Sequence, residues 1–143
     1  MPPLSRRSLL VLGLGVTASR TLGCGGPLSA NLPAEIAAGT DSSIAVGTLH
    51  ALAGQGVAVG RDGSGIYALS LICTHEGCDI STAGSVSASG IRCDCHGARF
   101  DGQGNLLQGP ARSSLVHFLV TKDTAGQLTI HTTETVGSST RLS

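Results

Sequence analysis

Two short segments hold most of the residues in this sequence that could carry chemistry. The first, residues 73–78, reads CTHEGC, and the second, residues 93–97, reads CDCHG. Together they contain four of the five cysteines and two of the five histidines. Thiolates and neutral imidazoles are side chains that transition metals bind well. Such clustering in an apolar chain with few charges indicates a metal or redox site rather than core packing.

The spacing of these cysteines and histidines argues against several familiar sites. Structural zinc sites pair cysteines about two to four residues apart, whereas the first pair here is Cys73-x-His75 and two cysteines are left over. Covalent c-type haem needs Cys-x-x-Cys-His, and residues 93–96 are one residue short of it. A thioredoxin-like Cys-x-x-Cys pair is absent, and a hydrolase nucleophile would leave the second segment unexplained. A sulfide-bridged iron pair fits better, because one iron can take two thiolates and the other two imidazoles.

The two segments together resemble the signature of the Rieske iron–sulfur family, whose boxes read Cys-Thr-His-x-Gly-Cys and Cys-x-Cys-His-Gly. Every cysteine, histidine and glycine of those boxes has a counterpart here, and 17 residues separate His75 from Cys93. Residues 109–111 (GPA) also resemble the proline loop that covers the cluster in this family. The resemblance implies an all-β domain over residues 40–135, a Rieske-type antiparallel β-sandwich with two cluster-binding loops at one tip.

The resemblance also assigns a role to each ligand position. Cys73 and Cys93 would hold the inner iron of a [2Fe–2S] cluster, one per chain, and His75 and His96 would hold the outer iron. In this family the histidines lie at the exposed tip of the domain. We therefore expect the electron to enter and leave through the histidine end.

Two further cysteines match family positions that form a disulfide between the two loops. These are Cys78 and Cys95. In the family this bridge occurs in the respiratory branch and its relatives, and it is usually missing from cytoplasmic ferredoxins and oxygenase components. Because a disulfide persists in an oxidising compartment, we expect the chain to belong to the exported, disulfide-containing branch.

Two positions depart from the quinol-oxidising members of the family. Those members carry a Ser directly after the His-Gly of the second box and a Tyr two residues later, and both hydroxyls donate hydrogen bonds at the cluster. Here the positions hold Ala98 and Phe100, whose side chains have no donor. We expect the reduction potential to lie below the upper end of the Rieske range, which spans roughly −150 to +300 mV.

The first 24 residues are expected to be an export signal. An arginine pair precedes an apolar stretch at residues 8–19, which is too short to span a bilayer. Residues 5–10 (SRRSLL) resemble the twin-arginine (Tat) export signal of bacteria. Residues 21–24 (TLGC) resemble a bacterial lipobox, which makes Cys24 a candidate for lipidation. Export by this route places the protein in the periplasm, with a lipid anchor to the membrane if Cys24 is modified.

The rest of the chain reads as short strands joined by glycine-rich turns. No segment after the signal has the long apolar period of an amphipathic helix. Residues 25–39 read as a flexible tether, and residues 136–143, rich in Ser and Thr, read as a flexible tail. The predicted strands are residues 44–47, 57–61, 66–72, 91–93, 98–100, 115–120 and 128–132.

Composition and length exclude several classes of protein. Nine Lys and Arg against nine Asp and Glu leave no basic excess, and three aromatic residues provide no base-stacking surface, so no nucleic-acid partner is expected. After residue 24, six basic and nine acidic side chains give a formal charge of −3. A chain of 143 residues predicts one domain. Three histidines outside the two segments are expected to be ordinary surface or strand residues: His50, His117 and His131.

These observations favour one-electron transfer in the periplasm, by a carrier or by the small subunit of a larger oxidoreductase. Such a protein needs no catalytic residue of its own. The partners would be redox proteins, namely a cytochrome, a quinol-oxidising subunit or a molybdenum subunit. The alternatives are the iron–sulfur subunit of a quinol:cytochrome c reductase, a small subunit like that of arsenite oxidases, and a non-redox binding module on a degenerate Rieske fold.

Overall fold

The computed structural model describes residues 31–143, which form ten β-strands and one 3-10 helix, η1 (Asp41–Ser43). All strand pairs are antiparallel, and residues 31–143 contain no α-helix. The strands are β1 (Glu35–Thr40), β2 (Thr48–Leu52), β3 (Val57–Asp62), β4 (Gly65–Ser70), β5 (Gly84–Ser87), β6 (Gly90–Cys93), β7 (Arg99–Phe100), β8 (Leu106–Gln108), β9 (His117–Lys122) and β10 (Gln127–Val136).

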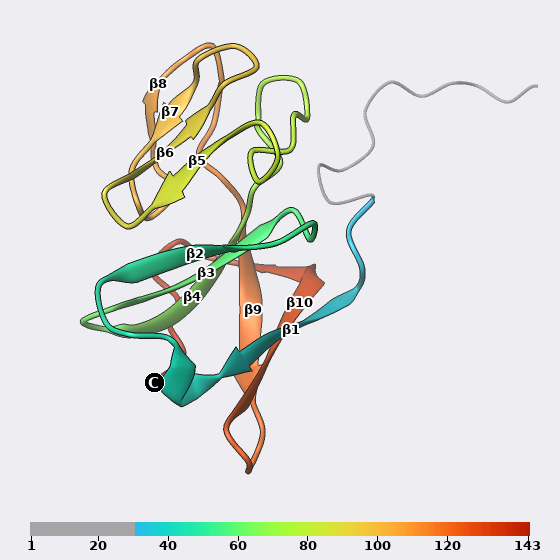
Figure 1. The fold of residues 1–143 in the computed structure, drawn as a ribbon, viewed down its shortest axis with the longest axis vertical. Helices are drawn as coiled ribbons and strands as arrows, with labels where there is room; N and C mark the ends of the chain where they lie inside the picture. Colours follow the sequence, from blue (N-terminus) through green and yellow to red (C-terminus); the bar gives the residue numbers. More distant parts are fainter. Residues whose placement is uncertain (1–30) are drawn as a thin grey trace, which may run out of the picture.

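The strands form two sheets of unequal size. The larger sheet has six strands in the order β1-β10-β9-β4-β3-β2, and the smaller has four in the order β5-β6-β7-β8. Figure 1 shows the four-stranded sheet at one end of the molecule, at the top of the view, with the six-stranded sheet below it. The expected all-β antiparallel fold is confirmed.

Strand β4 separates two apolar cores, because both of its faces are buried. Its residues alternate between the cores: Ile66 and Ala68 face the first, and Tyr67 and Leu69 face the second. A strand covered on both sides needs an unbroken apolar run, which residues 66–69 supply. The first core is completed by Ile44, which follows η1, and by residues of the large sheet: Ile36, Ala38, Val57, Val59, Phe118, Val120, Leu128 and Ile130.

The second core joins the small sheet to the large one. It contains the buried residues of β6 and β7, and two of its members are the predicted ligands Cys73 and Cys93. The candidate site is therefore attached to a packed layer instead of lying on free loops. The other members of this core are Leu49, Ala58, Leu71, Ile80, Ile91, Ala98, Phe100, Ala111 and Leu115.

The structure corrects the predicted limits of the domain. Strand β1 begins at Glu35, inside the segment predicted as tether, and pairs with β10. Its buried residues Ile36 and Ala38 alternate with exposed ones, which is the pattern of a half-buried strand. Local composition gave a weak signal there, because residues 37–39 are Ala-Ala-Gly.

The tail at residues 136–143 is not free either. Leu142 pairs with Ile66 through two backbone hydrogen bonds of 2.8 and 2.9 Å, and Arg141 forms an ion pair with Asp62 at 2.7 Å. A side chain at Gly65 would collide with the Leu142 carbonyl, so the tail lies directly against the β3–β4 turn. These partners are distant in the sequence, which a local prediction cannot detect.

Some strand predictions were also wrong. Residues 44–47 form no strand, and β2 begins one residue later, at Thr48. Strands β5 and β8 were not predicted, because β5 is short and mostly polar and β8 has only three residues. The export signal, the lipobox and Cys24 lie outside the described residues. Within residues 31–143, no helix has the length and hydropathy to cross a bilayer.

Candidate metal centre

The two predicted ligand segments form loops that repeat the same turn. In the first loop, between β4 and β5, the Cys73 N–H donates to the Cys78 carbonyl, and the Gly77 N–H donates to the Cys73 carbonyl. In the second loop, between β6 and β7, Cys93 donates to the Ala98 carbonyl, and Gly97 donates to the Cys93 carbonyl. The four distances lie between 2.8 and 2.9 Å. Each turn thus starts at a cysteine and returns to it four and five residues later.

The turns explain why each box needs its glycine. Gly77 has a φ of 74° and Gly97 a φ of 81°, in the left-handed region that side chains disfavour. Both glycines stand four residues after the cysteine that starts the turn. The sequence pattern Cys-x-x-x-Gly therefore encodes a backbone conformation in both loops.

Two free thiols lie buried next to each other at the base of the loops. Cys73 and Cys93 are 1% and 0% exposed. Burial raises the pKa of the Cys73 thiol, and contact with the Cys93 thiol raises this pKa further. Burial thus favours the neutral thiol at Cys73. A metal ion supplies the positive charge that turns such a pair into thiolate ligands.

The two imidazoles lie beside each other farther out. The ring centroids of His75 and His96 are 4.7 Å apart, with the ring planes at 83°. His75 Nδ1 is buried and has no hydrogen-bond partner within residues 31–143. Leaving such an atom unsatisfied costs about 1–3 kcal/mol, and a metal at this nitrogen would remove the cost. The donor set of two thiols and two imidazoles therefore fits an iron–sulfur cluster with mixed ligands.

Glu76 contacts the imidazole of His96. Its Oε2 lies 3.4 Å from His96 Nε2, and both side chains are exposed. His96 Nε2 therefore faces a carboxylate at the surface. The only sequence signal was the adjacency of Glu76 to His75, which does not reveal the contact across the loops.

A disulfide ties the two loops together. The structure pairs Cys78 with Cys95, as the resemblance implied, with their Cα atoms 6.7 Å apart. Cys78 closes the first turn and Cys95 lies inside the second. The bridge therefore fixes the separation of the two loops.

A third loop lies against the first. It contains the predicted proline loop, with a cis peptide between Gly109 and Pro110, and Ala111 is buried in the second core. The Thr74 hydroxyl donates to the Ser113 carbonyl at 2.6 Å. Thr74 thus joins the ligand loop to the loop predicted to cover the cluster.

The two positions that depart from the quinol-oxidising pattern are both buried. Ala98 is 0% and Phe100 is 1% exposed, and neither side chain offers a donor. Tyr67 is the sole tyrosine of the sequence. Its hydroxyl donates to the Gly102 carbonyl at 2.8 Å, in the turn between β7 and β8.

The remaining histidines lie on strands, outside the two ligand loops. His50 is exposed on β2, and His131 on β10 lies 3.4 Å from Glu35. His117 on β9 is buried, with Nε2 2.8 Å from the Gln103 carbonyl. Desolvation by burial lowers the pKa of His117 below its usual value.

Comparison with known proteins gives a family and several relatives. The family model of the Rieske [2Fe-2S] domain matches residues 35–122. The cytochrome b6-f complex iron-sulfur subunit of Synechococcus sp. (strain CC9605) is 39% identical over 56 residues, which cover 39% of this chain and 30% of the relative. The carotenoid phi-ring synthase of Chlorobaculum tepidum is 41% identical over 63 residues, covering 44% of this chain and 9% of that protein. The chain thus spans a third or less of these relatives.

Comparison with solved structures gives a chain that shares the fold. A chain from the complex of reduced oxygenase and oxidized ferredoxin in carbazole 1,9a-dioxygenase aligns with a TM-score of 0.51 and 25% identity, over 73% of this chain and 97% of that one. A cyanobacterial plasma membrane Rieske protein from Synechocystis PCC 6803 aligns with a TM-score of 0.48 and 25% identity, over 66% and 97%. Because the family model covers more than half of the sequence and both ligand loops, this chain belongs to the Rieske [2Fe–2S] domain family and carries a cluster of that type.

Proposed function

We propose that this protein is an exported electron-transfer protein, either a carrier or the small electron-transfer subunit of a larger oxidoreductase. When bound, the cluster accepts one electron and gives it up again. The observation that carries the proposal is that the same two loops bring two buried thiols together and two imidazoles together, with His75 Nδ1 left without a hydrogen bond within residues 31–143.

We assign the ligands according to burial. Cys73 and Cys93 hold the inner iron, because their thiols belong to the second core. His75 and His96 hold the outer iron as neutral imidazoles. The His96 side chain is 44% exposed, so the histidine end is the contact point for a redox partner. In this assignment the cysteine end of the centre is buried, and the histidine end is exposed to solvent.

The location in the periplasm is part of the proposal. The Cys78–Cys95 bridge supports it, since structural disulfides belong to oxidising compartments. The twin-arginine sequence at residues 5–10 and the lipobox ending at Cys24 support it independently. A lipid on Cys24 would keep the domain beside the membrane without a spanning helix.

A second candidate is the iron–sulfur subunit of a quinol:cytochrome c reductase. The similarity to cytochrome b6-f iron–sulfur subunits favours it. Ala98 and Phe100 argue against it, because neither supplies the hydrogen bond that would raise the potential for quinol oxidation. A small subunit beside a molybdenum subunit, as in arsenite oxidases, remains compatible with a lower potential.

The test is electron paramagnetic resonance (EPR) spectroscopy of the reduced protein, combined with a redox titration. We expect a Rieske-type signal, two iron ions per chain and a midpoint below the upper end of the roughly −150 to +300 mV range. Cys93→Ser and His75→Cys should each abolish the Rieske signal, whereas His50→Ala, at an exposed histidine on β2, should keep it. A retained signal in Cys93→Ser would refute the ligand assignment. A midpoint at the top of the range would favour quinol oxidation.

A further inference from the structure

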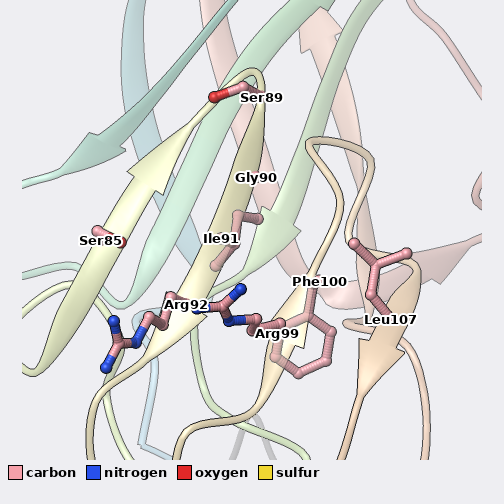
Figure 2. Close-up of a pocket in the computed structure, with 8 residues that line it drawn as sticks. All are labelled: Ser85, Ser89, Gly90, Ile91, Arg92, Arg99, Phe100 and Leu107. Atoms are coloured by element: carbon pink, nitrogen blue, oxygen red, sulfur yellow. The ribbon is translucent and has the colours of Figure 1, made fainter.

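The outer face of the four-stranded sheet carries a row of polar side chains. The strand register places Ser85 opposite Arg92, Arg92 opposite Arg99, and Arg99 opposite Gln108. All four residues are exposed. We call this row the arginine face; Figure 2 shows its two arginines side by side on neighbouring strands.

Two like charges directly opposite each other are unfavourable in a sheet. Asp94 compensates only one of them, with its Oδ1 3.0 Å from Arg92 Nε. Within residues 31–143, Arg99 makes no ion pair and no side-chain hydrogen bond. The face therefore carries positive charge that the fold leaves uncompensated.

Of the six basic residues within residues 31–143, only Arg99 and Arg112 lack an ion pair. Arg61 and Lys122 both pair with Asp41, and Arg141 pairs with Asp62. The basic residues of the large sheet and the tail are thus engaged in internal contacts. Arg99 is left exposed in a domain that carries a formal charge of −3, so its partner is expected from outside.

A hollow of about 200 Å³ lies on the arginine face. Its floor includes the buried residues Ile91 and Phe100, and one side is Leu107, whose side chain is 67% exposed. Figure 2 shows Leu107 on β8 and Arg99 on β7, on either side of Phe100. A cation beside an apolar wall fits an anionic group that carries or adjoins an apolar side chain.

The arginine face belongs to the same small sheet that holds the ligand loops. Arg92 directly precedes the ligand Cys93, and Arg99 starts β7 three residues after His96. A protein seated on this face would be held close to the histidine end.

We propose that the arginine face binds an acidic segment of the protein redox partner. In this proposal Arg99 binds a carboxylate, and Leu107 contacts an adjoining apolar side chain. The proposal rests on the proposed electron-transfer function. Arg suits this role because its guanidinium donates two parallel hydrogen bonds to a carboxylate. An anionic membrane is a poorer fit, since such surfaces bind clusters of about four to eight basic residues.

The probe is the capped peptide acetyl-Leu-Asp-Leu-amide, observed by saturation-transfer NMR on the cluster-loaded protein. We expect saturable binding that added salt weakens, and no binding of the Asn analogue. Arg99→Gln should weaken binding at least about fivefold, as expected for a central arginine contact. Leu107→Ser should weaken it as well.

Matched controls separate the arginine face from general charge and general hydrophobicity. Arg112→Gln removes another exposed arginine, and Val46→Ser removes a side chain with the same 67% exposure as Leu107. Both should leave peptide binding unchanged. Equal weakening by Arg112→Gln, equal binding of the Asn analogue, or no saturable binding would overturn the proposal. Binding only to vesicles containing anionic lipid, lost in Arg99→Gln, would assign the face to a membrane instead.

The EPR signal and the midpoint of every variant are measured in parallel. Arg99→Gln and Leu107→Ser should keep the cluster signal, because neither residue is among the ligands. A protein without a Rieske signal refutes the proposed function, whereas a normal signal without peptide binding refutes only the arginine face.

Discussion

The two histidines of the centre have different surroundings. His75 Nδ1 is buried and has no hydrogen-bond partner, whereas His96 Nε2 points to the surface, 3.4 Å from the Glu76 carboxylate. A negative charge beside an imidazole ligand stabilises the more positive, oxidised state of the centre. Glu76 is therefore expected to lower the reduction potential. The lack of hydrogen-bond donors at Ala98 and Phe100 is expected to lower it as well.

Glu76→Gln tests this electrostatic effect. We expect the midpoint potential to rise by about 10–40 mV, the equivalent of an exposed ion pair worth roughly 0.2–1 kcal/mol. Asp123→Asn, in the β9–β10 hairpin at the opposite end of the molecule (Figure 1), is the control and should leave the potential unchanged. The measurement is a redox titration at low salt. A lower potential in Glu76→Gln, or an equal rise in Asp123→Asn, would contradict the role of Glu76.

His117 gives a prediction about pH. Its pKa is lowered by burial from the usual 6.5, while an unfolded histidine keeps the usual value. The unfolded state therefore binds more protons as the pH falls below about 6.5, and the folded state loses stability there. His117→Gln should reduce this acid sensitivity, by up to about 1.4 kcal/mol per pH unit.

Urea unfolding of the oxidised protein between pH 5 and 7.5 measures this effect. Gln keeps a donor for the Gln103 carbonyl, which His117 Nε2 now contacts at 2.8 Å. The exposed His50→Gln is the matched control. If both variants show the acid sensitivity of the parent, His117 is not the group responsible.

At the scale of elements, the C-terminal segment fastens the two sheets together. Arg141 contacts Asp62 in the β3–β4 turn and Gln103 in the turn between β7 and β8, and its guanidinium lies 4.5 Å from the Tyr67 ring centroid. The Gln103 carbonyl also contacts His117 Nε2. One arginine from the tail thus joins the large sheet to the small one.

Arg141→Met should destabilise the protein by about 1–3 kcal/mol, because Asp62 and Gln103 lose their charged partner. Thermal unfolding measures the loss, and faster hydrogen exchange at residues 101–104 would show that the small sheet has loosened. Arg112→Met, at an exposed loop position, should change neither. Unfolding temperatures equal to that of the parent would show that the tail contributes no stability.

The elements differ in how well the sequence predicts them, and the reason is the range of the contacts. Residues 57–61 and 66–72 were recognisable because strands buried on both faces need unbroken apolar runs. The two ligand loops were recognisable for a similar local reason, because each box of cysteine, histidine and glycine is contiguous in the sequence. The Arg141–Asp62 pair, 79 residues apart, and the Glu76–His96 contact depend on how distant segments meet, and no local pattern encodes them.

At the scale of the whole molecule, the ligand cysteines belong to the core that joins the two sheets. If Cys73 and Cys93 hold iron as proposed, the iron would link the ligand loops to the second core, in addition to the disulfide. A group that binds only the folded state stabilises it. The first core, enclosed by the large sheet, has no such dependence.

Removal of iron by acid and a chelator should lower the unfolding temperature by about 5 °C or more, the equivalent of roughly 1 kcal/mol. Deuterium uptake should rise in residues 71–98 and stay unchanged in β9 and β10. Reduction of the Cys78–Cys95 bridge with iron retained is the comparison, and it should affect the loops less. Uniform uptake along the chain would mean that the two cores unfold as one unit.

The repeated turn of the ligand loops has a consequence for symmetry. Each loop contributes one thiol and one imidazole, and equivalent side chains lie next to each other. Cys73 lies beside Cys93, and His75 lies beside His96. Two copies of one turn facing each other in this way have approximate twofold character. With the proposed ligands, one metal ion would be held by two thiolates and the other by two imidazoles. A nearly symmetric backbone would thus hold a centre whose two ends differ in their ligands.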